Sequence, residues 1–348
     1  TDQLTAAALP SYAKEIITMS NIVRWGLLST ANINQAVIPP IRASERGELT
    51  AVASRSQESA DAYAAEWDIP MAFGSYEAML ESDAVDAVYI SLPNHLHAEW
   101  SIKAMQNGKR VLCEKPFALT VEEVDRVRAV SEETGMVITE AFMYRHHPQT
   151  KMAGEIIRSG ALGEVTAVRG VFSFKMGSRE NVRLVPEWGG GSLWDVGCYP
   201  MSMAQFLLGG APQWVFGDQW LGPEGVDDVF MGQMHYEDGR MAQFSCGFRT
   251  PEHAYVEVLG TNGTLKINEP FKPKLSGNDF LFENEDGQVE EIAVAAADLY
   301  LGEIEDLQAA ILDGAEPYLS LAETRDHVRT IVALYESAAS NAPVQLVE

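Results

Sequence analysis

Between residues 21 and 143, short apolar runs alternate with segments whose apolar positions recur at helical spacing. The runs predict strands and the segments between them predict helices. Strands are expected at 21–28, 49–54, 71–73, 85–91, 111–112 and 137–139, with helices at 29–43 (after a turn), 59–67, 76–81, 97–107 and from 120. Strands and helices that alternate over short connections are typical of a doubly wound parallel sheet.

The pattern changes after about residue 144, where long strand-like stretches begin. They cover 165–175, 213–220, 229–236, 241–249, 255–259, 264–267 and 289–294. Helical patterns are inserted around 192–208 and return at 301–339. We therefore predict an α/β chain with a parallel-sheet domain at 21–143 and an α+β domain with a large, mostly antiparallel open sheet at 144–300. Residues 1–20 would form an extension or arm, and 301–348 helices that pack back toward the first domain.

Composition excludes several classes of protein. The chain has 348 residues, enough for two cores, and its net charge of −25 makes nucleic acid and anionic membranes poor partners. No apolar run approaches the roughly 18–20 residues of a membrane span. Three cysteines form neither a disulfide framework nor a zinc pattern, which predicts a cytoplasmic location, with a removed export signal left open. No metal is expected, because the histidine pairs lack ligand spacing: His95, His97, His146 and His147.

The turn after the first strand resembles a degenerate dinucleotide fingerprint. Gly26 takes the first glycine position, Leu28 replaces the second and Ala31 takes the third. The following helix would offer backbone amides to a pyrophosphate. The expected cofactor contacts in this Rossmann-type turn are Gly26, Leu28, Ser29, Thr30, Ala31, Asn32 and Ile33.

The end of the second strand bears on the choice of cofactor. NAD sites usually place a carboxylate there for the ribose 2′-hydroxyl. Here Arg55 stands between Ser54 and Ser56. A guanidinium flanked by hydroxyls suits a 2′-phosphate, so NADP is favoured over NAD.

Glu114-Lys115-Pro116 follows the strand that ends at Val111-Leu112. Ligands bind at the carboxyl ends of strands in open α/β sheets, and Pro116 biases the residue before it toward an extended conformation. Taken alone, this stretch is also compatible with a solvated turn.

Four separated segments together resemble the glucose–fructose oxidoreductase, inositol dehydrogenase and rhizopine-catabolism (Gfo/Idh/MocA) family. They are Glu114-Lys115-Pro116, the segment 92–97, the segment 140–148 and the glycine-rich segment 189–200. The resemblance covers about residues 21–340. Within the family it is greatest to the branch of NADP-linked D-xylose dehydrogenases, dimeric dihydrodiol dehydrogenases and sugar ketoreductases, where a tyrosine replaces the usual active-site histidine; Tyr199 stands there.

The resemblance implies roles for residues that match the family's motifs. Lys115, Asp195 and Tyr199 would be catalytic. Further cofactor contacts would come from Leu92, Pro93, Asn94, His97, Glu114, Lys115 and Arg145, although His97 also suits a structural role at a helix start. The substrate would meet Lys115, Phe142, His146, Trp188, Asp195 and Tyr199.

The chemistry of the lysine and the tyrosine is consistent with hydride transfer, which also requires a proton to move on the substrate oxygen. A tyrosine with a pKa near 10 is a poor base, and a nearby ammonium would lower that pKa. Tyr199 is therefore the expected acid/base and Lys115 its electrostatic partner, with the reverse assignment left open. Asp195, four residues earlier, would share the face of a helix with Tyr199.

The sequence thus predicts an NADP-dependent oxidoreductase acting on a sugar or polyol, first of all an aldose 1-dehydrogenase of the D-xylose type. Alternatives are a keto-sugar reductase, a trans-dihydrodiol dehydrogenase and an aldose–ketose oxidoreductase that retains its cofactor. A non-catalytic NADP(H)-binding regulator is the alternative from another class. A homodimer or homotetramer is expected through the second-domain sheet.

Overall fold

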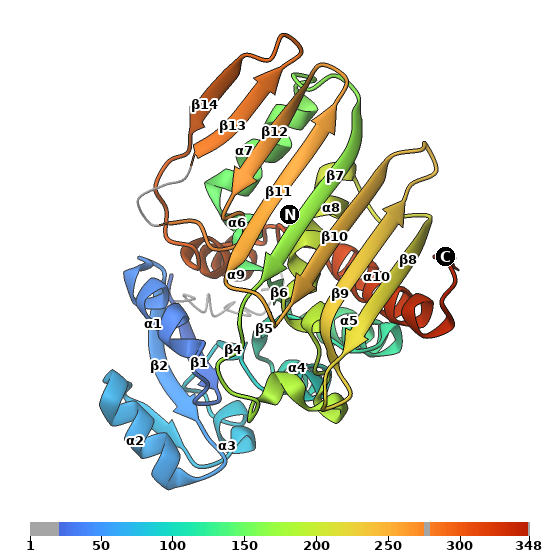
Figure 1. The fold of residues 1–348 in the computed structure, drawn as a ribbon. Coiled ribbons are helices and arrows are strands. Elements are labelled where there is room, and N and C mark those ends of the chain that lie inside the picture. The colour runs from blue at the N-terminus through green and yellow to red at the C-terminus, as the bar shows by residue number, and fades with distance from the viewer. Residues whose placement is uncertain (1–20, 275–278, 347–348) are drawn as a thin grey trace, which may run out of the picture.

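A computed structural model describes residues 21–274 and 279–346. The expected arm at 1–20 lies outside the described residues. The chain forms two sheets, with the nine-stranded sheet above the six-stranded one in Figure 1. This agrees with the predicted fold class.

The first sheet is entirely parallel, in the order β3-β2-β1-β4-β5-β6. Its central strands carry almost only buried residues because helices cover both faces. The strands are β1 Val23–Leu28, β2 Gly47–Ala53, β3 Met71–Phe73, β4 Ala87–Ile90, β5 Arg110–Glu114 and β6 Ile138–Ala141. The helices between them are α1 Asn34–Ala43, α2 Gln57–Trp67, α3 Tyr76–Leu80, α4 His97–Gln106 and α5 Val121–Thr134.

The second sheet has the order β14-β13-β12-β11-β7-β10-β9-β8-β15. Its pairs are antiparallel except for β7 with β10. The strands are β7 Val165–Ser173, β8 Trp214–Leu221, β9 Asp227–His235, β10 Met241–Gly247, β11 His253–Gly260, β12 Gly263–Asn268, β13 Asp279–Asn284, β14 Val289–Ala293 and β15 Val344–Gln345. The sequence patterns did not predict β13 and β15, a short strand and a two-residue edge strand that are held by pairing with β12 and β8.

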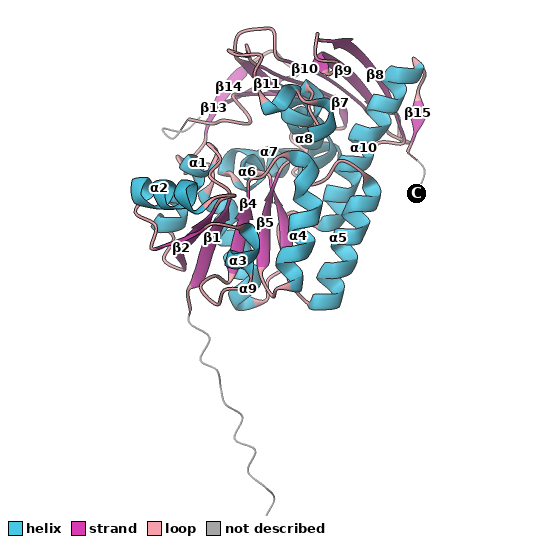
Figure 2. Cartoon of the chain, turned by 90° about the horizontal axis from the view of Figure 1, so that it is seen from below, coloured by secondary structure: helices cyan, strands magenta, loops and turns pink. Residues whose placement is uncertain are grey.

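Helices cover one face of the second sheet and leave the other open, as Figure 2 shows. They include α7 Pro148–Arg158, α8 Cys198–Leu208 and α10 Leu321–Ser340, while α6 Met143–His146 lies at the junction of the two sheets. The helix α9 Leu301–Asp313 returns to the first sheet, where Ile304 and Leu307 join the core around β1 and β4. A second core runs without a break from the first sheet into the second domain, so the strand ends that face the second domain are held against it.

Candidate active site

Lys115 connects the two domains at the carboxyl end of β5. Its Nζ donates to the backbone carbonyl oxygen of Asp195 at 2.7 Å and to Asp195 Oδ1 at 3.3 Å. Asp195 lies in a π-helical segment, Leu193–Gly197, that leads directly into α8. The lysine predicted to face the second domain therefore does so, and the side chains of both partners are only 13% exposed.

The carboxylate of Asp195 lies between two cations. Arg183, from a short 3₁₀ turn at Val182–Leu184, donates from Nε to Oδ2 at 2.8 Å. Burial alone would raise the pKa of Asp195, but Lys115 and Arg183 outweigh burial and lower this pKa, so the group stays ionised. Burial likewise opposes the charge of Lys115, yet the negative charge of Asp195 leaves the pKa of Lys115 above its ordinary value. Lys115 is therefore an ammonium at neutral pH.

Tyr199 presents its ring, and not its hydroxyl, to the lysine. Lys115 Nζ lies 5.1 Å from the ring centroid, while Tyr199 Oη donates to Met143 Sδ at 3.6 Å. Burial raises the pKa of this phenol well above its ordinary value. The expectation that Lys115 lowers the pKa of Tyr199 is therefore wrong for this geometry, because the π-helical turn between Asp195 and Tyr199 directs the two side chains differently.

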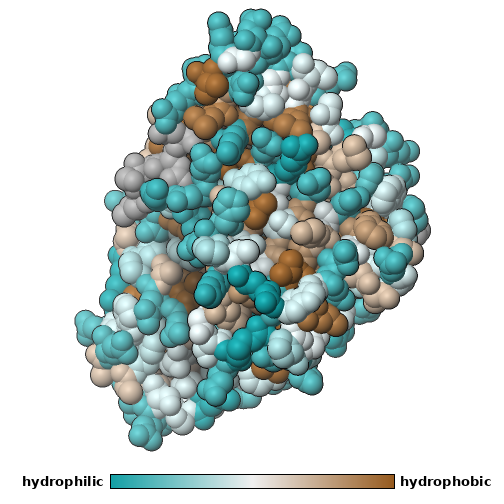
Figure 3. All heavy atoms as spheres, in the orientation of Figure 1, coloured by the Kyte–Doolittle hydropathy of each residue, from teal (hydrophilic) through white to brown (hydrophobic). Residues whose placement is uncertain are grey.

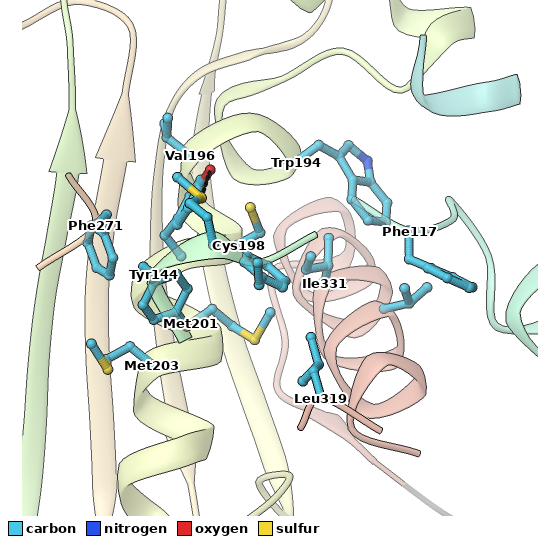
Figure 4. Packing of buried hydrophobic residues seen from close by; sticks show 14 of the residues in the cluster. Phe117, Tyr144, Trp194, Val196, Cys198, Met201, Met203, Phe271, Leu319 and Ile331 are labelled. Atoms are coloured by element: carbon cyan, nitrogen blue, oxygen red, sulfur yellow. Dashed lines mark hydrogen bonds between the residues drawn. The ribbon is translucent and has the colours of Figure 1, made fainter. Parts of the chain in front are cut away.

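An aromatic cluster fixes the Tyr199 ring. Phe142, Phe172 and Phe271 surround it at centroid distances of 5.4–5.5 Å, and Tyr144 lies at 5.7 Å. Figure 4 shows Tyr144 and Phe271 in this cluster beside the α8 residues Met201 and Met203. Phe142, expected to meet substrate, is a buried wall of the cluster.

The Glu114 carboxylate is held by one hydrogen bond from β4 and one from the backbone. Its carboxylate accepts from the Tyr89 hydroxyl of β4 and, at 3.1 Å, from the backbone amide of Lys115. Burial raises the pKa of Glu114, against the effect of Lys115. Glu303 of α9 is also completely buried, has a strongly raised pKa, and has no hydrogen-bond partner among the described residues. On the side of the first sheet, the site therefore contains two buried carboxyl groups, of which Glu114 is hydrogen-bonded and Glu303 is not.

The nucleotide turn lies three residues later than its predicted register. Gly26 and Leu28 are buried inside β1, and a Cβ on Gly26 would lie 2.9 Å from Met79 Sδ, so this glycine serves strand packing. The turn begins at Ser29, whose φ of 151° is unusual for a residue with a side chain. The spacing of the fingerprint then falls on Ser29, Ala31 and Asn34.

Hydrogen bonds hold this turn in place. Ser29 Oγ accepts from the amide of Ala31 at 3.1 Å, and the Asn34 side chain donates to the Ser29 carbonyl at 2.8 Å. Thr30, Asn32 and Ile33 complete the turn ahead of α1, and their amides have no acceptor among residues 21–274 and 279–346. A helix start with such amides fits a pyrophosphate.

Arg55 follows β2 as expected and its side chain is exposed. Ser56 caps α2 by accepting from the Ser59 amide at 3.2 Å, and Ser54 is buried. Of the three residues expected around a 2′-phosphate, Arg55 is the one whose side chain is both cationic and accessible, which fits that group.

The loop after β4 is fixed by His97 and Asn94. His97 is buried, with Nδ1 2.7 Å from the Pro116 carbonyl and Nε2 2.7 Å from the Leu92 carbonyl. His97 therefore has the structural role that the sequence also suggested. The predicted direct contact of His97 with the cofactor is not supported, because both ring nitrogens already contact backbone carbonyls. Asn94, beside Pro93, donates to the Gly189 carbonyl at 3.0 Å, which ties the first domain to the glycine-rich segment. Trp188 stacks on His95 with a centroid distance of 5.6 Å and stays 38% exposed, so part of its side chain remains accessible.

Arg145 and His146 belong to the packing between the domains. Arg145 is 2% exposed, donates to Glu323 at 3.1 Å and lies 4.3 Å from the Phe206 ring. His146 packs against Tyr318, and burial lowers its pKa to about 3. The expected contacts of Arg145 with cofactor and of His146 with substrate are thus replaced by buried contacts with α8, α10 and the loop before α10.

Sequence reasoning missed three residues around the site: Tyr89, Arg183 and Asp227. Arg183 lies in a loop without periodicity, and Tyr89 reads as an ordinary strand residue. Asp227 accepts from Ser192 Oγ at 2.7 Å, the Leu193 amide at 2.8 Å and Tyr335 Oη at 2.7 Å. It therefore anchors the start of the segment that carries Asp195; the only sequence signal was an acidic pair before a strand.

Matches to known families agree with this architecture. Residues 23–142 match the family described as "Oxidoreductase family, NAD-binding Rossmann fold", and residues 150–266 match the "GFO/IDH/MocA C-terminal domain". The chain belongs to the Gfo/Idh/MocA oxidoreductase family. The resemblance predicted from the four motifs is confirmed.

Several members of the Gfo/Idh/MocA family match over most of their length. D-xylose 1-dehydrogenase (NADP(+)) 2 of Haloferax volcanii is 40% identical over 325 residues, 92% of this chain and 99% of that protein. The dTDP-3,4-didehydro-2,6-dideoxy-alpha-D-glucose 3-reductase of Actinomadura kijaniata is 32% identical, covering 86% and 90%. The solved structure of KijD10, a 3-ketoreductase from the same organism in complex with NADP and TDP-benzene, has a TM-score of 0.86 at 28% identity and covers 91% of this chain and 98% of that one.

No helix at 21–274 or 279–346 is long and apolar enough to cross a membrane. Over the same ranges, no group of His, Cys, Asp and Glu side chains has the geometry of a metal site.

Proposed function

We propose that the chain is an NADP-dependent oxidoreductase that acts on a sugar or polyol, most specifically an aldose 1-dehydrogenase of the D-xylose type. The observation that carries the proposal is the Lys115 ammonium, held by Asp195 at the carboxyl edge of the first sheet. When bound, NADP(H) supplies the hydride chemistry. The chain's own residues must bind the cofactor, orient the substrate and handle one proton.

The residues that would hold NADP fit it. The Ser29–Ile33 turn offers amides to the pyrophosphate, and Arg55 offers a guanidinium to the 2′-phosphate. Asn94 and Glu114 would lie on the nicotinamide side, next to Lys115. The identity of 40% to an NADP(+)-linked dehydrogenase supports the same choice of cofactor.

Lys115 would be the proton carrier, which is the assignment that the sequence left open. The Lys115 ammonium donates its proton to the substrate oxygen when a carbonyl is reduced. For the oxidation of an alcohol the ammonium first loses a proton to solvent, and the neutral amine then accepts the hydroxyl proton as the hydride leaves the carbon. Tyr199 would act through its ring, which limits the positions open to the ammonium. Asp195 and Arg183 would bind substrate hydroxyls, with the exposed Trp188 face at the entrance.

A keto-sugar reductase is the second candidate. The raised pKa of Lys115 favours it, because a group that is protonated at neutral pH is a ready acid and a poor base. The relatives that reduce keto-sugars, by their names, show that this fold accommodates the reverse direction.

A panel of substrates separates the candidates. NADPH formation with D-xylose and related aldoses supports the dehydrogenase, and NADPH consumption with keto-sugars supports the reductase. Turnover of trans-dihydrodiols would indicate a trans-dihydrodiol dehydrogenase. Cofactor that survives dialysis and turns over between two sugars would indicate an aldose–ketose oxidoreductase. Tight NADPH binding without turnover of any substrate would support a non-catalytic NADP(H)-binding regulator and contradict the proposal.

The open face of the second sheet is the proposed subunit interface. Trp220, Met231 and Met241 on this face are 49%, 59% and 46% exposed. Figure 3 views this side and shows apolar side chains interrupting a polar surface. A homodimer or homotetramer would cover them.

A cytoplasmic location is also proposed, because Cys113, Cys198 and Cys246 are buried free thiols.

A further inference from the structure

His97, the first residue of α4, is 1% exposed, and each of its ring nitrogens faces a backbone carbonyl oxygen. Nδ1 lies 2.7 Å from the oxygen of Pro116, after β5, and Nε2 lies 2.7 Å from the oxygen of Leu92, after β4. A carbonyl oxygen can accept a hydrogen bond but cannot donate one. Both ring nitrogens of His97 must therefore be donors.

A neutral imidazole ring cannot make this pair of hydrogen bonds. It carries one N–H, so its second nitrogen would turn a lone pair toward a carbonyl lone pair at 2.7 Å. Turning the ring over about its Cβ–Cγ bond does not help, because ring carbons would then lie closer to the two oxygens than C–H groups normally approach. The imidazolium form has an N–H on each nitrogen and satisfies both contacts.

Glu140 of β6 provides a negative charge on the other side of the peptide unit between Pro116 and Phe117. Its side chain is 2% exposed, and Oε1 accepts from the Phe117 amide at 3.0 Å while Oε2 accepts from the Thr324 hydroxyl at 3.0 Å. Donors on both oxygens suit an ionised carboxylate. The peptide unit is thus held at its C=O by His97 and at its N–H by Glu140.

Several influences on the charge of His97 oppose one another. Burial, the largest influence, lowers the pKa of His97, as does the Lys115 ammonium, whereas the two carbonyl contacts and Glu140 raise it. His327 of α10 also faces Glu140, but its Nδ1 lies 3.7 Å from Oε2, beyond a hydrogen bond. The hydrogen-bond geometry decides for the charged ring, because loss of either proton would leave two lone pairs facing each other where no water relieves them.

We propose that His97 is a buried imidazolium at neutral pH and that, together with Glu140, it positions the turn that carries Lys115. The two side chains hold the peptide unit that lies one residue beyond Lys115. The second N–H of His97 holds the loop after β4, whose Asn94 donates to the Gly189 carbonyl. One protonated ring therefore joins both loops at the carboxyl edge of the first sheet. Only the catalytic consequence of this inference rests on the proposed function.

NMR of the full chain with nitrogen-15-labelled histidine measures the protonation state without any turnover. The chain has seven histidines, and the signals of His97 are those that disappear in folded His97→Gln or His97→Asn. We expect both ring nitrogens of His97 to carry a proton at about pH 7.5, where a histidine with a pKa near 6.5 is mostly neutral. A ring with one protonated and one bare nitrogen at that pH would overturn the inference, whatever the activity.

Glu140→Gln separates the charge of this residue from its hydrogen bond. The amide oxygen of glutamine can still accept from the Phe117 N–H, so the counter-charge is lost while this contact is kept. We expect His97 to lose a proton at neutral pH in this variant and kcat to fall by roughly 10- to 100-fold, as for a small displacement of a catalytic group. Thermal melting confirms that the variant is folded.

Glu123→Gln is the matched control, because Glu123 Oε2 accepts from the Leu119 amide at 3.0 Å between β5 and α5 and the side chain is 24% exposed. This variant should change neither the protonation of His97 nor kcat. An unchanged His97 in folded Glu140→Gln would overturn the pairing with Glu140. Loss of the His97 proton with unchanged kcat would overturn the positioning of Lys115. A native chain that turns over no sugar while His97 stays protonated would contradict the proposed function and not the imidazolium.

Discussion

Arg183 Nε lies 2.8 Å from Asp195 Oδ2, so a half-exposed arginine from an irregular loop completes the charge balance of a buried carboxylate. We predict that Arg183→Met raises KM for the sugar roughly two- to fivefold, as expected for a partly exposed ion pair, with little change in melting temperature. Steady-state kinetics measure this. Arg169→Met, which removes a surface pair with Glu257, is the control and should leave KM unchanged. An equal effect of both variants would contradict a role for Arg183 in the site.

Two substitutions of Tyr199 distinguish a role of its ring from a role of its hydroxyl. Because Tyr199 Oη contacts Met143 Sδ, Tyr199→Phe should keep kcat within about threefold, the cost of one weak neutral hydrogen bond at most. Tyr199→Leu should lower both stability and turnover, since it removes the ring from the aromatic cluster and from Lys115. A loss of more than 100-fold in Tyr199→Phe would restore the phenol as acid/base.

Arg55 should determine the choice between the two dinucleotides. Arg55→Gln removes the cation expected at the 2′-phosphate and should raise the Kd for NADP by roughly 10- to 100-fold. The Kd for NAD, which has no such phosphate, serves as the internal control and should change little. Nucleotide titration followed by fluorescence gives both constants. Equal weakening of the two would show that Arg55 supports the fold of the loop instead.

Asp227 should matter for the stability of the segment that carries Asp195. In Asp227→Asn an amide group would face donors from Ser192, Leu193 or Tyr335, so we expect a loss of about 1–3 kcal/mol in unfolding free energy. Chemical denaturation measures it. Asp218→Asn, on an exposed strand of the second sheet, should cost almost nothing. Matching stabilities of the two variants would argue against the anchor.

The pH dependence of the two directions should be opposite. Lys115 has a raised pKa, so its proton is present at neutral pH and is lost as pH rises through that pKa. Reduction, which needs the proton, should therefore be fast at neutral pH and fall on the alkaline side. Oxidation, which must release a proton, should rise with pH over the same interval. Profiles of kcat/KM in both directions test this, and parallel profiles would exclude Lys115 as the shared group.

Sequence patterns predicted the architecture of the chain better than they predicted the geometry of the site. Alternating apolar runs predicted every strand of the first sheet, because strands buried on both faces leave a strong signal. The resemblance to the family, and not the apolar pattern, brought Lys115 and Asp195 together, because both residues belong to motifs with a known place in the fold. The predicted strand at 21–28 already contained Gly26, but the fingerprint match assigned this glycine to the phosphate turn, since a glycine chosen for packing and one chosen for such a turn look alike in sequence.

The orientation of Tyr199 was beyond the sequence for a different reason. A spacing of four residues implies one shared face only in an α-helix, and the π-helical turn at Leu193–Gly197 breaks that relation. Arg145 and His146 were misplaced because the match to the family's motif implied contacts with cofactor and substrate, whereas Arg145 is buried against Glu323 and His146 against Tyr318. Tertiary packing, which the sequence pattern does not reveal, determines the orientation of all three side chains.

Turnover of Lys115→Met, measured alongside its affinity for NADPH, tests most directly whether the Lys115 ammonium is the proton carrier. Methionine keeps much of the length of the side chain and removes the charge. We predict that kcat falls by roughly 100-fold or more, as for loss of a general acid, while the Kd for NADPH stays within about threefold. Turnover within a few-fold of the native protein, with NADPH still bound, would contradict it.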